Sequence, residues 1–230
     1  MKLERKKDKV RLRSMLSFYQ PKSIFSEQFR SIRSNIQFSS VDKSVKSILV
    51  TSSVPGEGKT TTAVNLAISF AQQGNRVLLV DTDLRKPTLH HIFERTQHRG
   101  LTNYLAGHYR SIEDFVCDSG IDNLQIVTSG PIPPNPAELL SASEMKVFMK
   151  EAFENYDMVV YDTSPVLAVT DAQILSNVCD GVILVIRSGK TRTEQVKKAK
   201  ENLEQANAKI LGAILNKKKV SKHESYYYIQ

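Results

Sequence analysis

The sequence "VTSSVPGEGKTTTAVNLAISFA", residues 50–71, joins a short apolar run to a glycine-containing loop and then to a helical pattern. Residues 53–60 follow the phosphate-loop spacing G-x-x-x-x-G-K-[ST], except that Ser53 replaces the first glycine. Gly56 and Gly58 allow backbone N–H groups to approach phosphate oxygens, and the positive end of the following helix adds to the attraction. The position of this loop between a strand and a helix predicts an α/β nucleotide-binding domain.

Two side chains of this loop carry most of its chemistry. Lys59 supplies a mobile positive charge for the β and γ phosphates of ATP, and Thr60 offers a hydroxyl to Mg²⁺. The candidate nucleotide-binding residues of the loop are Pro55, Gly56, Glu57, Gly58, Lys59, Thr60 and Thr61.

The rest of the chain alternates apolar runs with helical patterns. Strands are expected at residues 47–52, 76–81, 123–130, 157–162, 181–188 and 210–216, and helices at residues 21–40, 58–73, 136–156, 171–179 and 191–208. Several of the strands are apolar throughout, which indicates that helices cover both of their faces. The pattern predicts a mostly parallel, doubly wound sheet, in which ligands bind at the carboxyl ends of the strands.

Length and charge suggest how the chain is divided. The 230 residues suffice for one α/β domain, and two separated cysteines argue against a disulfide scaffold or a zinc site. No apolar run approaches the roughly 18 residues of a membrane span. The net charge of +8 is concentrated in a basic N-terminal segment, which we interpret as a solvated arm, with binding to nucleic acid or an anionic membrane as the alternative. We expect a flexible arm at residues 1–20, a nucleotide-binding domain at 21–219 and a mobile tail at 220–230.

Three carboxylates follow two of the expected strands. Asp81 and Asp83 lie in "VLLVDTDLR", residues 77–85, where the apolar run ends. Asp162 lies in "MVVYDTSP", residues 158–165. An isolated D-x-D is more often a turn or a helix cap. Beside a phosphate loop, however, these acids predict a Mg·ATP site with an additional carboxylate that can accept a proton.

Two further patterns lie outside this cluster. Tyr226, Tyr227 and Tyr228 are consecutive near the chain end, either as a surface tail or as tethered phenol acceptors. Glu27, Arg30 and Arg33 recur at three-residue steps in "SEQFRSIR", so they lie close together on one helix. That helix surface is either an exposed ion-pair face or an assembly surface.

Together these motifs resemble the bacterial tyrosine kinases (BY-kinases) of capsule and exopolysaccharide clusters, in the split form of Gram-positive bacteria. The resemblance extends from about residue 21 to the tyrosines and includes "PGEGKTTT", "DTDLRKPT", "SGPIPPNPAELL", "YDTSPVLAVTDAQIL" and "LGAILNKKK". It implies a P-loop fold related to the Min and Par ATPases, with Lys59 on the phosphates and Thr60, Asp83 and Asp162 around Mg²⁺. Asp81 corresponds to the base for the tyrosine hydroxyl, and Asn216 is similar to an asparagine near the adenine of related ATPases.

The resemblance also implies partners and a place in the cell. It implies a homo-oligomeric ring assembled through Glu27, Arg30 and Arg33, and autophosphorylation of residues 226–228 between subunits. It further implies a membrane activator with a cytoplasmic tail, a cognate tyrosine phosphatase and substrates such as sugar-nucleotide enzymes, for a cytoplasmic protein recruited to the cell membrane. No specific nucleic acid is expected. The chain departs from the family at Ser164, where D-T-S-P replaces D-T-P-P, and we expect little effect of this change.

The competing interpretation is a Min- or Par-type switch in which water accepts the phosphoryl group. Those ATPases carry an additional loop lysine at the position of Val54, which valine cannot replace. The tyrosines and the additional D-x-D acid favour a kinase. The eleven residues from Leu215 to Tyr226 span at most roughly 36–40 Å, so the tail reaches either its own site or a neighbour's.

Overall fold

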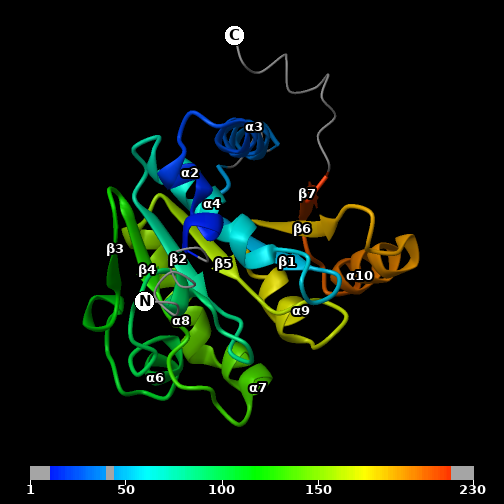
Figure 1. Cartoon of the computed structure of the whole chain (residues 1–230). Helices are drawn as coiled ribbons and strands as arrows, with labels where there is room; N and C mark the ends of the chain where they lie inside the picture. The colour runs from blue at the N-terminus through cyan, green and yellow to red at the C-terminus, as the bar shows by residue number, and fades with distance from the viewer. Residues whose placement is uncertain (1–10, 40–43, 219–230) are drawn as a thin grey trace, which may run out of the picture.

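A seven-stranded sheet forms the centre of the protein in the computed structural model, which describes residues 11–39 and 44–218 (Figure 1). The strands are β1 (Ser47–Ser52), β2 (Val77–Asp81), β3 (Cys117–Ile121), β4 (Leu124–Val127), β5 (Met158–Asp162), β6 (Gly181–Arg187) and β7 (Ile210–Asn216). Their order across the sheet is β3-β4-β2-β5-β1-β6-β7. Only β3, at one edge, pairs in the antiparallel sense. The expected mostly parallel, doubly wound sheet is confirmed.

Helices cover both faces of the sheet (Figure 1). The helices on one face are α2 (Leu16–Tyr19), α3 (Ile24–Phe38), α4 (Lys59–Ala71) and α5 (Leu89–Ile92). The other face carries α6 (Leu101–Leu105), the short 3-10 helix η1 (Ile112–Asp114), α7 (Pro136–Ser141), α8 (Ser143–Asn155), α9 (Asp171–Ser176) and α10 (Thr193–Gln205). Strands β1, β2 and β5 are buried along their whole length because each is covered from both sides.

Several features differ from the sequence-based expectations, among them the short helices α5, α6 and η1, which were not expected. The single helix expected at residues 136–156 is two helices, because Ala142 has an extended conformation (φ −65°, ψ 158°) between α7 and α8. Strand β3 was not expected, since its sequence CDSGI has no apolar run. Within the expected flexible arm, residues 11–19 are packed: Met15 is 1% exposed, and the Ser17 amide donates to Asn65 Oδ1 of α4 at 2.8 Å. The packed part of the chain therefore begins before residue 20.

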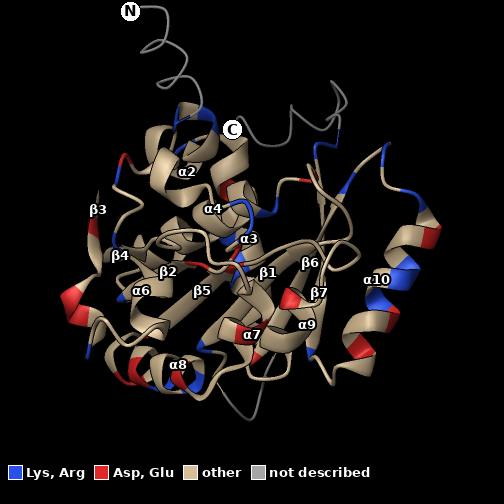
Figure 2. Cartoon of the chain, turned by 90° about the horizontal axis from the view of Figure 1, so that it is seen from below, with Lys and Arg blue, Asp and Glu red and all other residues tan. Residues whose placement is uncertain are grey.

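The charged surface helices carry both signs. Figure 2 shows basic and acidic residues close together along α10, where Lys198 and Lys200 pair with Glu201 and Glu204. This described helix is therefore not a purely basic stripe of the kind that tracks a phosphate backbone. None of the helices in residues 11–39 and 44–218 is long and apolar enough to cross a membrane.

Candidate active site

The candidate site forms where three neighbouring strands end. Strand β5 lies between β2 and β1, and all three run in the same direction. Their carboxyl ends therefore bring the phosphate loop after β1, the acids after β2 and Asp162 of β5 to one edge. Asp81 and Asp162 are direct neighbours across the β2–β5 pairing. The structure therefore places these predicted acids at the edge of the sheet where the phosphate loop lies.

The conformation of the phosphate loop depends on its two glycines. Gly56 and Gly58 have backbone φ values of +83° and +100°, which residues other than glycine rarely adopt. A Cβ atom on Gly58 would also lie only 2.1 Å from Asn216 Nδ2. Gly58 directly precedes α4, so Lys59 and Thr60 occupy the first turn of that helix. The backbone N–H groups at this end of a helix attract anions.

Lys59 links the loop to the acids opposite it. Its Nζ lies 2.7 Å from Asp83 Oδ2 and 3.5 Å from Asp162 Oδ1. Burial lowers the pKa of Lys59, but the charges of Asp162 and Asp83 outweigh this effect, so the pKa is raised. Burial likewise opposes ionisation of Asp83, but the Lys59 ammonium lowers the pKa of this carboxyl. The pair is therefore held in its charged form.

Asp81 lies deeper and is fully buried. Its Oδ2 accepts hydrogen bonds from the backbone N–H groups of Thr88, at 3.0 Å, and Leu89, at 2.9 Å. Its Oδ1 is buried without a hydrogen-bond partner. Burial and the charge of Asp162 raise the pKa of Asp81 to about 7, against an ordinary value of 3.8. A carboxylate with such a pKa suits proton transfer near neutral pH.

A second network connects Asp83 to helix α9. Ser164 Oγ lies 2.8 Å from Asp83 Oδ1 and 3.2 Å from Asp171 Oδ2, within hydrogen-bond reach of both. Asp171 in turn accepts two hydrogen bonds from Arg85, at 2.9 and 3.2 Å. Sequence reasoning missed Asp171 and Arg85 as site residues and noted Ser164 only as a departure from the family motif. The available signal in the sequence was Ser164 itself, a polar residue at a position where the family has proline.

A cavity of about 360 Å³ opens in front of these residues. It is lined by Pro55, Gly56, Gly58, Lys59, Thr60, Thr61, Asp83, Arg85, Lys86, Thr88, Ser164, Pro165, Ala168 and Val169. Six of the seven predicted loop residues line it, and Glu57 does not. Two other predicted site residues do not line the cavity. Asp81 lies behind Thr88, whose backbone N–H it accepts. Asn216 donates from its Nδ2 to the Glu57 carbonyl at 2.8 Å.

The protein groups fit a magnesium ion that takes most of its ligands from phosphates and water. Thr60 Oγ1 donates to Asp162 Oδ2 at 2.7 Å, and Asp162 Oδ1 is buried without a hydrogen-bond partner. Burial raises the pKa of Asp162, although Lys59 opposes this effect. The described residues include no group of three or more His, Cys, Asp or Glu side chains that could hold a metal ion. A Thr hydroxyl and one or two acids are the usual protein contribution at nucleotide-bound Mg²⁺.

The predicted assembly residues lie on α3, away from the cavity. Arg30 donates to Glu27 Oε2 and to the Pro21 carbonyl, at 2.9 Å from its Nε and Nη1, respectively. Arg33 donates to the Ser69 carbonyl of α4, so it is held within its own chain. Burial and then the charge of Arg30 lower the pKa of Arg33. The tyrosines at 226–228 lie outside the described residues.

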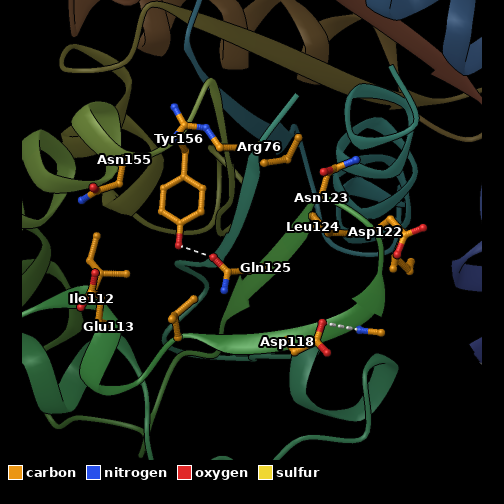
Figure 3. A pocket seen from close by; sticks show the side chains of 14 residues that line it. Arg76, Ile112, Glu113, Asp118, Asp122, Asn123, Leu124, Gln125, Asn155 and Tyr156 are labelled. Atoms are coloured by element: carbon orange, nitrogen blue, oxygen red, sulfur yellow. Dashed lines mark hydrogen bonds between the residues drawn. The ribbon is translucent and has the colours of Figure 1, made fainter. Parts of the chain in front are cut away.

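A larger hollow, of about 980 Å³, lies at the opposite ends of the strands (Figure 3). Val77 and Leu124 begin β2 and β4 there, and Tyr156 hydroxyl donates to Gln125 Oε1 at 2.7 Å. Burial, followed by the charges of Glu113 and Glu151, raises the pKa of Tyr156 to about 12. Because ligands of parallel α/β sheets bind at the carboxyl ends of strands, the smaller cavity is the candidate site.

A phosphate loop after β1, facing acids at the ends of β2 and β5, defines a P-loop nucleotide-binding protein. Residues 45–217 match a protein-family model described as an AAA domain. The chain is 56% identical over 216 residues to tyrosine-protein kinase YwqD of Bacillus subtilis, covering 94% of this chain and 91% of that protein. It therefore belongs to the bacterial tyrosine-protein kinase family.

Two solved structures show the same fold. The chimerical protein CapA2B2 has a TM-score of 0.87 at 43% identity, with 90% of this chain and 91% of that chain covered. The septum site-determining protein MinD from Pyrococcus horikoshii has a TM-score of 0.64 at 23% identity, covering 80% of this chain and 76% of that one. The latter likeness supports the fold alone.

Proposed function

We propose that this chain is an ATP-dependent protein-tyrosine kinase that phosphorylates Tyr226, Tyr227 and Tyr228 of its own tail, between subunits. The observation that carries this proposal is the convergence of Lys59, Thr60, Asp83 and Asp162 on one cavity, with Asp81 directly behind it. The same set fits hydrolysis by water. Family membership and the proposed phenol acceptors favour the kinase, and the Min- or Par-type switch is the alternative that the experiment below tests.

In the proposed reaction, the chain positions ATP and removes a proton. The loop N–H groups and the Lys59 ammonium bind the phosphates of ATP and stabilise the charge that develops on the transferring phosphoryl group. Asp81 accepts the proton of the tyrosine hydroxyl at Oδ1, the oxygen without a partner. The phenol oxygen bonds to the γ phosphorus, the bond from that phosphorus to the β–γ bridging oxygen breaks, and ADP leaves.

Thr60, Asp83 and Asp162 are the residues that would hold Mg²⁺. Bound there, Mg²⁺ would neutralise negative charge on the β and γ phosphates of ATP. Asn216 would lie near the adenine of the nucleotide, by its resemblance to an asparagine of related ATPases; its Nδ2 donates to the carbonyl of Glu57 in the phosphate loop. Glu57 takes part through its backbone, since its side chain does not line the cavity.

The proposed organisation comprises a basic arm, a kinase domain and a tyrosine-containing tail at residues 220–230. Glu27, Arg30 and Arg33 contribute to a ring of subunits, and each phosphotyrosine adds about −1.5 to −2 charge beside the acidic site, which weakens rebinding of the tail. The arm, with seven Lys or Arg residues in the first thirteen positions, helps to hold the chain at an anionic inner membrane surface.

The proposed partners follow from family membership. They are a membrane activator whose cytoplasmic tail stimulates the kinase, a cognate tyrosine phosphatase, and substrates such as sugar-nucleotide enzymes. Through them the kinase regulates capsule or exopolysaccharide synthesis.

The proposal is tested by measuring phosphoryl transfer to water and to tyrosine in the same reaction. Purified full-length chain is incubated with Mg·ATP, with and without the activator's cytoplasmic tail, while free phosphate and phosphotyrosine are measured together. The kinase predicts phosphotyrosine that disappears when Tyr226, Tyr227 and Tyr228 are all changed to Phe. Steady phosphate release without phosphotyrosine, with the activator present, would make water the acceptor and support the switch.

A further inference from the structure

The side chain of Glu57 is turned away from the cavity formed by the rest of its loop. Glu57 is only 2% exposed, and its carboxylate makes contacts on two sides. Oε2 accepts the backbone N–H of Val54 at 3.0 Å, within the phosphate loop. Oε1 accepts the hydroxyl of Thr191 and the backbone N–H of Arg187, the latter at 3.4 Å. One carboxylate thus joins the loop to the turn between β6 and α10.

The backbone of Glu57 makes a second connection. Its carbonyl accepts a hydrogen bond from Asn216 Nδ2 at 2.8 Å, at the end of β7. The Asn216 carbonyl accepts the Ser188 N–H at 2.9 Å, so this residue is tied to the same turn. The phosphate loop, the β6–α10 turn and the end of β7 therefore meet at Glu57, although they are about 130 to 159 residues apart in sequence.

The position of Glu57 in the loop makes such a connection useful. It stands between Gly56 and Gly58, both in the left-handed region, so the adjoining backbone has more conformational freedom than side-chain-bearing residues would allow. Loop N–H groups bind phosphate well only when they are held in place before the ligand arrives. A buried carboxylate with three donors can supply that restraint.

We propose that Glu57 is a positioning residue for nucleotide binding, which fixes the phosphate loop against the β6–α10 turn without touching the phosphates through its side chain. The inference rests on the proposed function only in requiring that the chain bind nucleotide. It assigns to Thr191 the role of partner to Glu57.

The donors around Glu57 explain why a carboxylate is required. Both of its oxygens act as acceptors, and a carboxylate offers acceptor lone pairs on each of them. Glutamine at this position has one acceptor oxygen and one NH₂ group. Its NH₂ group would face either the Val54 N–H or the Arg187 N–H, so one side of the connection is lost although size and shape are conserved.

The test compares Glu57→Gln with a matched control, Glu151→Gln. Glu151 also accepts a hydroxyl and a backbone N–H, from Ser111 at 2.8 Å and Ile112 at 2.7 Å, but it lies on α8 away from the loop. Dissociation constants for ATP and ADP with Mg²⁺ are measured by calorimetry, and Tm is measured without nucleotide. We expect Glu57→Gln to weaken the binding of both nucleotides about tenfold, equivalent to ~1.4 kcal/mol. Glu151→Gln is expected to leave the affinity for both nucleotides unchanged.

Thr191 provides a second, milder variant. Thr191→Val removes one donor to Glu57 while conserving shape, and Thr191→Ser retains the hydroxyl. We expect Thr191→Val to weaken ATP binding, Thr191→Ser to restore it, and Glu57→Gln with Thr191→Val to add little beyond Glu57→Gln alone. Unchanged affinity in both Glu57→Gln and Thr191→Val would overturn the inference. Failure of the unaltered chain to bind ATP would instead contradict the proposed function.

Discussion

The Lys59 ammonium lies 2.7 Å from Asp83 Oδ2, with the two side chains 13% and 6% exposed. A buried charge of this kind is stable only with its partner, because removing either one leaves the other without compensation. The pair also places the loop's positive charge directly beside an acid proposed to hold Mg²⁺. Phosphate binding and metal binding are therefore expected to depend on each other at this point.

Lys59→Met is expected to abolish nucleotide binding and to lower the free energy of unfolding by about 3 kcal/mol, since Asp83 and Asp162 lose their cation. Adding Asp83→Asn should recover part of that stability but none of the binding. Urea unfolding and calorimetry measure the two effects. Lys150→Met, at an exposed lysine of α8, is the control and should change neither.

Asp81→Asn should stabilise the protein while removing transfer activity. Burial raises the pKa of Asp81 to about 7, so the folded state binds the proton more tightly than the unfolded state. Stability therefore falls as the pH rises from about 4 to about 7. The Asn variant avoids this loss, which is on the order of 4 kcal/mol above neutral pH.

The measurement for Asp81→Asn is Tm without nucleotide or metal at pH 5 and pH 8. The advantage of the variant should be larger at pH 8. Tyrosine phosphorylation should fall about 100-fold or more, as expected for loss of a general base. An equal Tm advantage at both pH values would argue against a raised pKa, and retained phosphorylation would remove Asp81 from the role of base.

The sequence predicted most of the fold because its central strands are apolar on both faces. Strands β1, β2 and β5 are short, fully buried runs, and an aspartate marks the end of β2 and of β5. Strand β3 escaped prediction because it is stabilised by pairing with β4 instead of by an apolar pattern. The break at Ala142 was missed because the sequence on either side of it is compatible with one continuous helix.

Ser164→Ala tests the connection between Asp83 and Asp171. Without the hydroxyl, Asp83 Oδ1 retains only the Lys86 N–H, at 3.1 Å, and Asp171 retains Arg85. We expect a loss of about 1–2 kcal/mol in stability and a several-fold fall in kcat. Although little effect was expected from the sequence, the observed contacts give this serine a definite role.

Thermal unfolding and steady-state kinetics measure the effect of Ser164→Ala. Ser141→Ala, which removes an exposed hydroxyl bonded to the Glu138 carbonyl, serves as control. Ser164→Pro introduces the family residue and should resemble Ser164→Ala in kcat. Kinetics indistinguishable from those of the unaltered chain in both variants would show that the connection does not support catalysis.

Arg30→Ala and Arg33→Ala are expected to differ in their effects. Arg30 contacts Glu27 of its own helix, at the surface, so its loss should reduce oligomer mass and autophosphorylation with little change in Tm. Arg33 also donates to the Ser69 carbonyl, so its loss should lower Tm as well. Light scattering measures mass, with Lys197→Ala on α10 as control. Unchanged mass in the double Arg variant would contradict an assembly role.

The candidate site was only partly predictable for a physical reason. Acids at the carboxyl ends of parallel strands share one edge of the sheet, which is why the sequence could place Asp81, Asp83 and Asp162 beside the loop. The direction of each side chain depends on partners distant in sequence: Glu57 turns toward Thr191, and Asp81 toward the N-terminus of α5. No local pattern contains that information.

Phosphopeptide mass spectrometry shows whether the tyrosines at 226–228 accept the phosphoryl group. The full chain is incubated with Mg·ATP and the activator's cytoplasmic tail, beside Lys59→Met and Lys150→Met proteins shown to be folded by circular dichroism. We expect phosphate on the peptide that contains residues 226–228 in the unaltered and Lys150→Met chains, and none in Lys59→Met. ATP consumption without any modified tyrosine would contradict it.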